Sequence, residues 1–159
     1  MARDLRILFL NHYFPPEGNA PATRAHGFCR RWVKRSPKPF DVTVITSAPN
    51  VPDGKVYPGY KNSLSHHEVI DGISVYRVWT YLAPNAGTGK RILNYISYML
   101  SATVRSLFLR RPDVVIATSP QFFNGWAGVL VSWLRWCPFI LEVRDIWPES
   151  IVEIGRAHV

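Results

Sequence analysis

The sequence of 159 residues lacks the features that mark membrane-spanning, disulfide-stabilised or zinc-binding proteins. Its two cysteines, Cys29 and Cys137, stand far apart and form no Cys-x-x-Cys pair. Both are therefore expected to be small buried hydrophobes of a reducing compartment. The apolar segment 121–136 falls short of the ~20 residues that a membrane span needs. Repeats and low-complexity tracts are also missing, and 47% hydrophobic residues fits one globular domain with a sizeable core.

Acidic residues are scarce, with 11 Asp and Glu against 19 Lys and Arg, which gives a net charge of +8. This excess favours anionic partners such as phosphates, an acidic membrane surface or nucleic acid. Because no nucleic-acid-binding motif accompanies the charge, we expect a phosphorylated substrate or an anionic membrane, and no nucleic acid. The chain enters its first strand without a signal peptide, which predicts a cytoplasmic protein.

Two common phosphate-binding motifs are absent as well. Gly87-Thr88-Gly89-Lys90 invites comparison with a P-loop, but Pro84 stands where the first glycine belongs and Arg91 replaces Ser or Thr. The chain also lacks Gly-x-Gly-x-x-Gly, and its second predicted strand ends in Thr46-Ser47 instead of the acidic residue that binds a ribose. A dinucleotide-dependent oxidoreductase is therefore an alternative function, but the sequence lacks the main motif of that class of enzyme. A non-catalytic α/β binding module is a second alternative, for which the chain offers no positive sign.

The segments that are present alternate between strand and helix. Apolar runs and helical periodicity predict strands at 5–10, 42–46, 66–70, 73–79, 114–117 and 139–143, and helices at 21–35, 92–109 and 121–136. In the first helix, Ala25, Phe28, Cys29 and Trp32 recur at helical spacing and should face the sheet. The order predicts an α/β fold, a Rossmann-like, doubly wound and mostly parallel sheet with helices on both faces.

The loop after the first strand, residues 11–20 and called the first loop below, is the strongest candidate for a binding site. Pro15 and Pro16 exclude helix there, Gly18 lets a ligand approach the backbone, and Pro21 suits the first turn of the next helix. In open α/β sheets ligands lie at the carboxyl ends of strands, and a helix start favours an anion. An ordinary strand-to-helix connection is the alternative interpretation.

Two further groups of candidates follow later strands. Ser119 stands after the strand at 114–117, where it either caps the next helix or contacts substrate. Glu142, Arg144 and Asp145 come at the end of the last strand, and a structural salt bridge is the alternative to a role in chemistry. His12 and His26 flank the first loop and are expected to be structural more often than functional.

Four segments in order resemble bacterial family 4 glycosyltransferases of the GT-B fold. They are Tyr13-Phe14-Pro15-Pro16-Glu17-Gly18 through Thr23-Arg24, Asp41-Val42-Thr43-Val44-Ile45-Thr46, Asp113-Val114-Val115-Ile116-Ala117-Thr118-Ser119-Pro120 and Glu142-Val143-Arg144-Asp145-Ile146-Trp147-Pro148. Within the family the sequence is most similar to enzymes of O-antigen, capsule and colanic-acid assembly.

The resemblance implies a retaining enzyme that transfers a sugar from a nucleotide-diphosphate sugar to a polyprenyl-diphosphate-linked glycan. Residues 1–152 would be part of the N-terminal, acceptor-binding Rossmann-like domain, and the C-terminal donor-binding domain would be absent. Donor binding in these enzymes involves a Glu-x7-Glu pair, which this sequence lacks. The fragment alone is therefore expected to be inactive, and no cofactor or metal is implied beyond the donor sugar.

The resemblance also suggests roles for single residues. It implies that the substrate or its diphosphate is bound by Glu17, Gly18, Asn19, Arg24 and Ser119. Arg144 and Asp145 would be catalytic, at a place where family members often carry a histidine. The protein is expected at the inner face of the cytoplasmic membrane, held by basic residues along 24–35 and by the apolar helix at 121–136.

The last seven residues, 153–159, match one reading frame of a common sequencing-library adapter. We therefore expect native sequence to stop near Val152 and exclude this tail from the prediction of the fold.

Overall fold

The protein is described by a computed structural model for residues 4–35, 37–82, 87–119 and 121–144. Its elements are β1 (Arg6–Leu10), α1 (Ala20–Val33), β2 (Asp41–Ser47), β3 (Ser65–Ile70), β4 (Ile73–Val78), α2 (Thr88–Leu107), β5 (Val114–Thr118), α3 (Phe122–Arg135) and β6 (Phe139–Glu142). The six strands form one sheet in the order β3-β4-β2-β1-β5-β6. Neighbouring strands pair in parallel except for β3, which forms an antiparallel hairpin with β4. The predicted fold class is confirmed.

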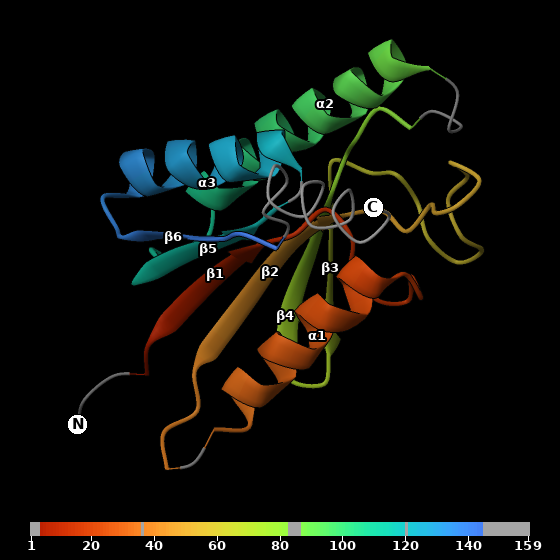
Figure 1. Ribbon diagram of the computed structural model, residues 1–159. Helices are drawn as coiled ribbons and strands as arrows, with labels where there is room; N and C mark the ends of the chain where they lie inside the picture. The colour runs from red at the N-terminus through yellow and green to blue at the C-terminus, as the bar shows by residue number, and fades with distance from the viewer. Residues whose placement is uncertain (1–3, 36, 83–86, 120, 145–159) are drawn as a thin grey trace, which may run out of the picture.

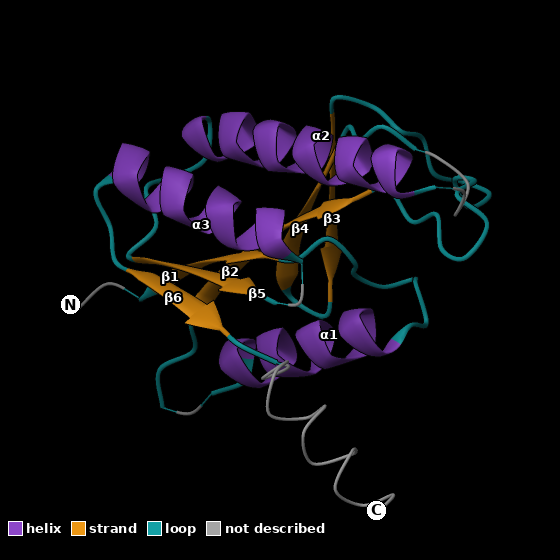
Figure 2. Ribbon diagram, turned by 45° about the horizontal axis from the view of Figure 1, so that its top comes forward, coloured by secondary structure: helices purple, strands orange, loops and turns teal. Residues whose placement is uncertain are grey.

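The helices form one layer on each side of the sheet (Figures 1 and 2). α1 covers one face, while α2 and α3 lie side by side on the other. Ala25 and Cys29 are buried and Trp32 packs against Phe9, so the predicted inner face of α1 is confirmed at these positions. Phe28 is half-buried and stacks on Trp32.

One helix boundary differs from the prediction. α2 begins at Thr88, four residues before the predicted start at position 92. Its first turn, Thr88 to Arg91, is exposed, so the segment carries no apolar periodicity by which to recognise a helix. This early start is important for the site, because it extends the helix with Lys90 and Arg91.

The strand order places a topological switch point between β1 and β5. From β1 the chain proceeds through α1 to β2 on one side, and from β5 it proceeds through α3 to β6 on the other. The two connections lie on opposite faces, and they part where the carboxyl ends of β1 and β5 lie side by side (Figure 2). Open α/β sheets bind their ligands in the crevice at such a point.

The contact between α3 and β6 depends on the absence of a side chain at one helical position. Gly128 is buried, and a Cβ added there would lie 2.7 Å from the Phe139 Cζ and closer still to another ring carbon. At Gly125, one turn earlier, an added Cβ would meet Leu141 Cδ1 at 3.5 Å, an ordinary van der Waals distance.

These two glycines predict opposite effects for the same substitution. Gly128→Ala should destabilise the fold by roughly 1–3 kcal/mol, because the Phe139 ring must move from its packed position. Gly125→Ala should stabilise it by up to about 1 kcal/mol, because alanine is the better helix former and fits the space. Urea unfolding of both variants measures the difference. Equal effects would show that the approach of α3 to β6 is not limited by Gly128.

Candidate functional site

Two adjoining cavities lie at the carboxyl ends of the strands and form what we call the switch-point cleft. The larger, about 450 Å³, lies between the first loop, the start of α2, the start of α3 and Arg144. The smaller, about 290 Å³, lies between the first loop, the loop at 50–54 and the start of α2. Their shared lining consists of His12, Tyr13, Pro21, Arg91 and Tyr95.

Two buried charged side chains hold the first loop in place through hydrogen bonds to the main chain. Glu17 is 2% exposed, and its Oε1 accepts hydrogen bonds from the main-chain N–H groups of Asn50 (2.9 Å) and Val51 (3.2 Å). Burial raises the pKa of the Glu17 carboxyl, and these hydrogen bonds oppose that shift. The Arg77 guanidinium, also buried, donates to the carbonyl oxygens of Pro15 and Ser47. Glu17 therefore lies beneath the loop, where it contacts the neighbouring loop, and it lines neither cavity of the cleft.

The other candidates of the first loop occupy different surroundings. Asn19 lines the smaller cavity and caps α1, accepting a hydrogen bond from the Ala22 N–H (2.9 Å). Gly18 is exposed, and a Cβ built on it would meet no atom of the protein within 4 Å. Arg24 donates to Glu142 Oε1 at 2.5 Å and lines neither cavity. Its charge is thus directed to the end of β6.

The candidates after β5 and β6 are joined to each other. Ser119 Oγ accepts a hydrogen bond from the Arg144 N–H (2.7 Å). The expectation that Ser119 caps the next helix is wrong, because the N-cap of α3 is Gln121. Arg144 lines the larger cavity, whereas Asp145 lies outside the described residues. The carboxylate of Glu142 pairs with Arg24 of α1, a residue outside this cluster.

His12 lies at the back of the cleft and lines both cavities. Its ring is in edge contact with the rings of Tyr13, Tyr95 and Tyr98, at centroid distances of 4.7, 5.6 and 4.7 Å. Burial lowers the pKa of His12 to about 3, an effect that a hydrogen bond with Asn94 partly offsets. The imidazole is therefore neutral at physiological pH.

Sequence reasoning missed the contribution of α2 to the cleft. Lys90, Arg91, Asn94 and Tyr95 all line it from the first turns of that helix. One signal was available: cations in a first turn face the positive end of the helix dipole, an arrangement that is unfavourable unless an anion is nearby. No side chain caps this helix start by a hydrogen bond within the described residues. Two arginines, Arg91 and Arg144, and the starts of α2 and α3 thus surround the cleft, which suits a phosphate group.

An apolar cavity of about 350 Å³ continues from the larger cavity of the cleft along α3. The two share Gln121 and Phe122, and the apolar cavity extends past Trp126 and Val129 to Leu141 on β6. Cationic groups and an apolar groove therefore adjoin each other. The described residues include no group of three His, Cys, Asp or Glu side chains placed to hold a metal ion.

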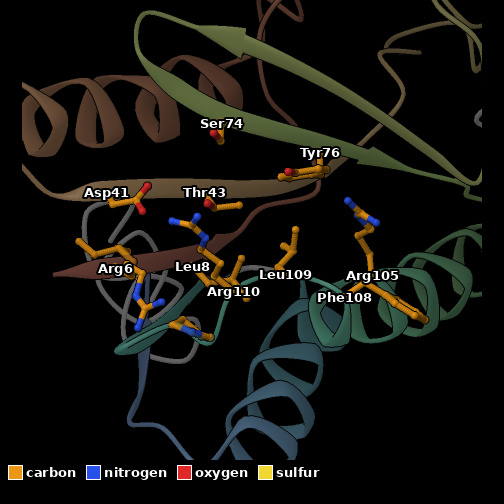
Figure 3. Close-up of a pocket in the computed structure, with 12 residues that line it drawn as sticks. Arg6, Leu8, Asp41, Thr43, Ser74, Tyr76, Arg105, Phe108, Leu109 and Arg110 are labelled. Carbon is orange, nitrogen blue, oxygen red and sulfur yellow. The ribbon is translucent and has the colours of Figure 1, made fainter. Parts of the chain in front are cut away.

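A further cavity of about 400 Å³ lies at the opposite, amino-terminal edge of the sheet (Figure 3). Two of its three arginines have partners within the fold: Arg6 pairs with Asp113, and the Arg105 guanidinium lies over the Tyr76 ring at 4.4 Å. They also lie near the end of α2, where the helix dipole favours cations. This charge is explained by the fold, and the switch-point cleft is the better candidate for a ligand site.

Comparisons with known proteins agree with the α/β fold described above. The family described as "Glycosyl transferase 4-like domain" matches residues 19–157. Among solved structures, the C-terminal domain of a hydrogenase from Pyrococcus furiosus is similar, with a TM-score of 0.50 and 15% sequence identity over 89% of this chain and 94% of that chain. At that identity the similarity concerns the fold alone. No curated protein matches this chain.

The buried neutral His12 predicts a specific dependence of stability on pH. The unfolded chain binds a proton at a pKa near 6.5, whereas folded His12 remains neutral down to about pH 3. Its contribution to stability is therefore complete above pH 6.5 and is lost as the pH falls toward 3. Between pH 7 and pH 5 the wild type should lose about 2 kcal/mol more unfolding free energy than His12→Gln.

Urea unfolding of both proteins at several pH values measures this difference. The raised pKa of Glu17 acts in the opposite direction, but it is common to both proteins and cancels in the comparison. Parallel pH profiles for wild type and variant would contradict a neutral His12.

Proposed function

The chain belongs to the glycosyl transferase 4-like domain family, and we propose that it forms the acceptor-binding part of a retaining glycosyltransferase. The enzyme would transfer a sugar from a nucleotide-diphosphate sugar to a polyprenyl-diphosphate-linked glycan, in the synthesis of a bacterial cell-surface polysaccharide such as O-antigen or capsule. Residues 1–152 would supply the acceptor side, and the donor would bind to a second domain. On this proposal the chain alone transfers no sugar.

The observation that carries the proposal is the continuity of the switch-point cleft with the apolar cavity along α3. A polyprenyl diphosphate has a doubly charged head beside a long hydrocarbon chain. Arg91 and Arg144 would hold the diphosphate, while Phe122 and Trp126 would contact the first isoprene units. A dinucleotide needs no such groove, so no observation favours the oxidoreductase over the transferase.

The proposed roles of the sequence candidates follow from their positions. Asn19 would present its main-chain N–H group to the acceptor at the rim of the smaller cavity, Gly18 would do so from the preceding position of the loop, and Ser119 would position Arg144. Glu17 would support the loop from below. Arg24 would reach the ligand only by leaving Glu142. Stabilisation of the departing diphosphate would be electrostatic and would come from cations and N–H donors. Asp145 is an anion outside the described residues, and it stays a catalytic candidate in a different role.

Attachment to an anionic membrane is the second part of the proposal, and the structure changes which residues would serve it. α1, which carries the basic residues along 24–35, and α3 lie on opposite faces of the sheet (Figure 2), so a membrane contact through α3 would draw on other cations than those of α1. Between Asp71 and Glu142, however, the sequence holds seven basic residues and one acidic residue. Lys90, Arg91, Arg110 and Arg111 are exposed at the two ends of α2.

The same helix and α3 carry exposed apolar side chains, which we call together the α2/α3 apolar surface. It consists of Ile92, Leu93, Leu100, Val104, Leu107, Phe108, Phe122, Trp126, Val129, Trp133, Leu134 and Trp136. An apolar surface with tryptophans and with cations at the ends of α2 suits the interface of an anionic bilayer, and it adjoins the groove proposed for the polyprenyl chain. None of the described helices is long and apolar enough to cross a membrane.

Farnesyl diphosphate, a short soluble prenyl diphosphate, should bind this chain more tightly than either farnesol or inorganic diphosphate. Arg144→Gln should weaken binding roughly tenfold or more, because charge-assisted hydrogen bonds contribute about 1.5–3 kcal/mol. Isothermal titration calorimetry of the 159-residue chain measures both effects. Equal affinity for inorganic diphosphate and farnesyl diphosphate would contradict the combined site.

Three further variants sharpen this experiment. Arg31→Gln removes the same charge from an exposed position on α1 and should change the affinity little. Arg24→Gln tests whether Arg24 leaves Glu142 for the ligand. Gly18→Val should weaken binding without a loss of thermal stability, since a Cβ at Gly18 meets open space. If Arg144→Gln and Arg31→Gln lose the same affinity for farnesyl diphosphate, the effect comes from the net charge of the protein and not from a contact of Arg144.

Vesicles that contain anionic phospholipid should carry this chain upward in flotation, and added salt should weaken the binding. Trp133→Glu should reduce the bound fraction, because Trp133 is 72% exposed on the α2/α3 apolar surface. Leu64→Glu is the matched control, since Leu64 is 84% exposed outside α2 and α3. Binding that persists in Trp133→Glu and falls in Leu64→Glu would place the membrane contact elsewhere.

A further inference from the structure

Asn124, one of the residues that line the larger cavity of the switch-point cleft, has an amide oxygen without a hydrogen-bond partner among the described residues. Asn124 is 1% exposed, and its Nδ2 donates to the carbonyl oxygens of Leu10 (3.0 Å) and Thr118 (2.9 Å). Because these two carbonyls can only accept, the orientation of the amide is determined. Oδ1 is the opposite end, buried and without a donor in the described structure, and the residue lines the larger cavity.

Gln121 presents a second oxygen of the same kind one turn earlier. Its Nε2 lies 3.4 Å from His12 Nδ1. This contact joins the Gln121 amide nitrogen to Nδ1, which accepts a hydrogen bond when the proton of the neutral imidazole is on Nε2. Its Oε1 is then directed away, and this atom too is buried without a donor among the described residues. Gln121 lines the same cavity.

The two oxygens impose a chemical requirement on any ligand of this cavity. A buried acceptor without a donor is costly, so a ligand that donates hydrogen bonds at this depth is favoured over one that only accepts. An ammonium group could donate, but Arg91 and Arg144 line the same cavity and would repel it. A neutral hydroxyl group attached to an anion satisfies both the oxygens and the arginines.

We propose that Asn124 Oδ1 and Gln121 Oε1 are specificity determinants that accept hydrogen bonds from hydroxyl groups of the sugar held in the switch-point cleft. The inference rests on the proposed function, because it takes the ligand to be a sugar linked to phosphate. The arginines bind the phosphate, and the two amide oxygens distinguish a hydroxyl donor from a group that cannot donate. His12 acts through Gln121 and positions its amide.

The experiment measures the affinity of this chain for inorganic phosphate and for the 1-phosphates of glucose, galactose, mannose and N-acetylglucosamine by nuclear magnetic resonance titration. At least one sugar phosphate should bind roughly tenfold more tightly than inorganic phosphate. The side-chain NH2 signals of Asn124 should shift with that sugar phosphate and stay in place with inorganic phosphate. For that sugar, a deoxyfluoro analogue at one hydroxyl position should lose the preference, since fluorine fills the space but donates no hydrogen bond.

Two substitutions at Gln121 separate the acceptor from the shape of the side chain. Gln121→Met removes the oxygen at similar volume and should abolish most of the preference for the sugar phosphate over inorganic phosphate. Gln121→Glu keeps oxygen acceptors and should retain that preference, although it weakens the binding of every phosphate. Thermal unfolding of both variants controls for the lost contact with His12.

The outcomes distinguish the inference from the function on which it rests. Equal affinity for all five phosphates, or a preference that survives in Gln121→Met, overturns the hydroxyl determinant and leaves the anion-binding cleft standing. Absence of any phosphate binding, together with failure of farnesyl diphosphate to bind, overturns the proposed function and the inference with it.

Discussion

A single buried guanidinium holds together the parts from which the cleft is built. Arg77 on β4 is 1% exposed, pairs with Glu68 on β3 at 2.5 Å and donates to the main chain of β2 and of the first loop. Taking an arginine out of water is expensive unless its donors are matched, so the surrounding carbonyls and carboxylate must keep their places. The antiparallel hairpin, the end of β2 and the proline-rich loop are thereby held in one arrangement. A loop that would otherwise be variable becomes a defined wall of the cleft.

Buried polar groups of the cleft also restrict one another in position and in charge, and His12 is the example. The carbonyl oxygen of His12 accepts from Thr46 and Ser47, while its ring is enclosed by tyrosines and remains neutral. Neutral acceptors lie deep in the cleft, and permanent cations line it as well, an order that suits a ligand with both hydroxyl groups and phosphate. The apolar surface of α2 and α3 extends from the same place. Recognition of the diphosphate head, of the polyprenyl hydrocarbon and of the membrane would thus occur on one side of the sheet.

Position along the sequence was a poor guide to the cations of the site. Arg24 lies one turn after the first loop and for that reason is predicted to contact its ligand, yet it pairs with Glu142 on β6. Arg91 is 67 residues further along the chain, counted as 91 − 24, and it lines the cleft because α2 begins above the end of β1. Ser119 likewise contacts Arg144 instead of capping α3. Each difference arises because crossovers in a parallel sheet bring together residues that are distant in sequence.

Local patterns in the sequence determined the elements of this protein and their order. Apolar runs of strand length, amphipathic helices and the Asp71-Gly72 turn are read from neighbouring residues, because propensity and burial act over a few positions at a time. The same patterns predicted a binding site at the carboxyl ends of the strands, which is where the switch-point cleft lies. Only the tertiary structure decided which side chains meet there, because strand order and helix start set their distances. It also decided that Glu17 supports the loop from below and that α1 and α3 lie on opposite faces, since burial and ion pairing depend on contacts that no local pattern encodes.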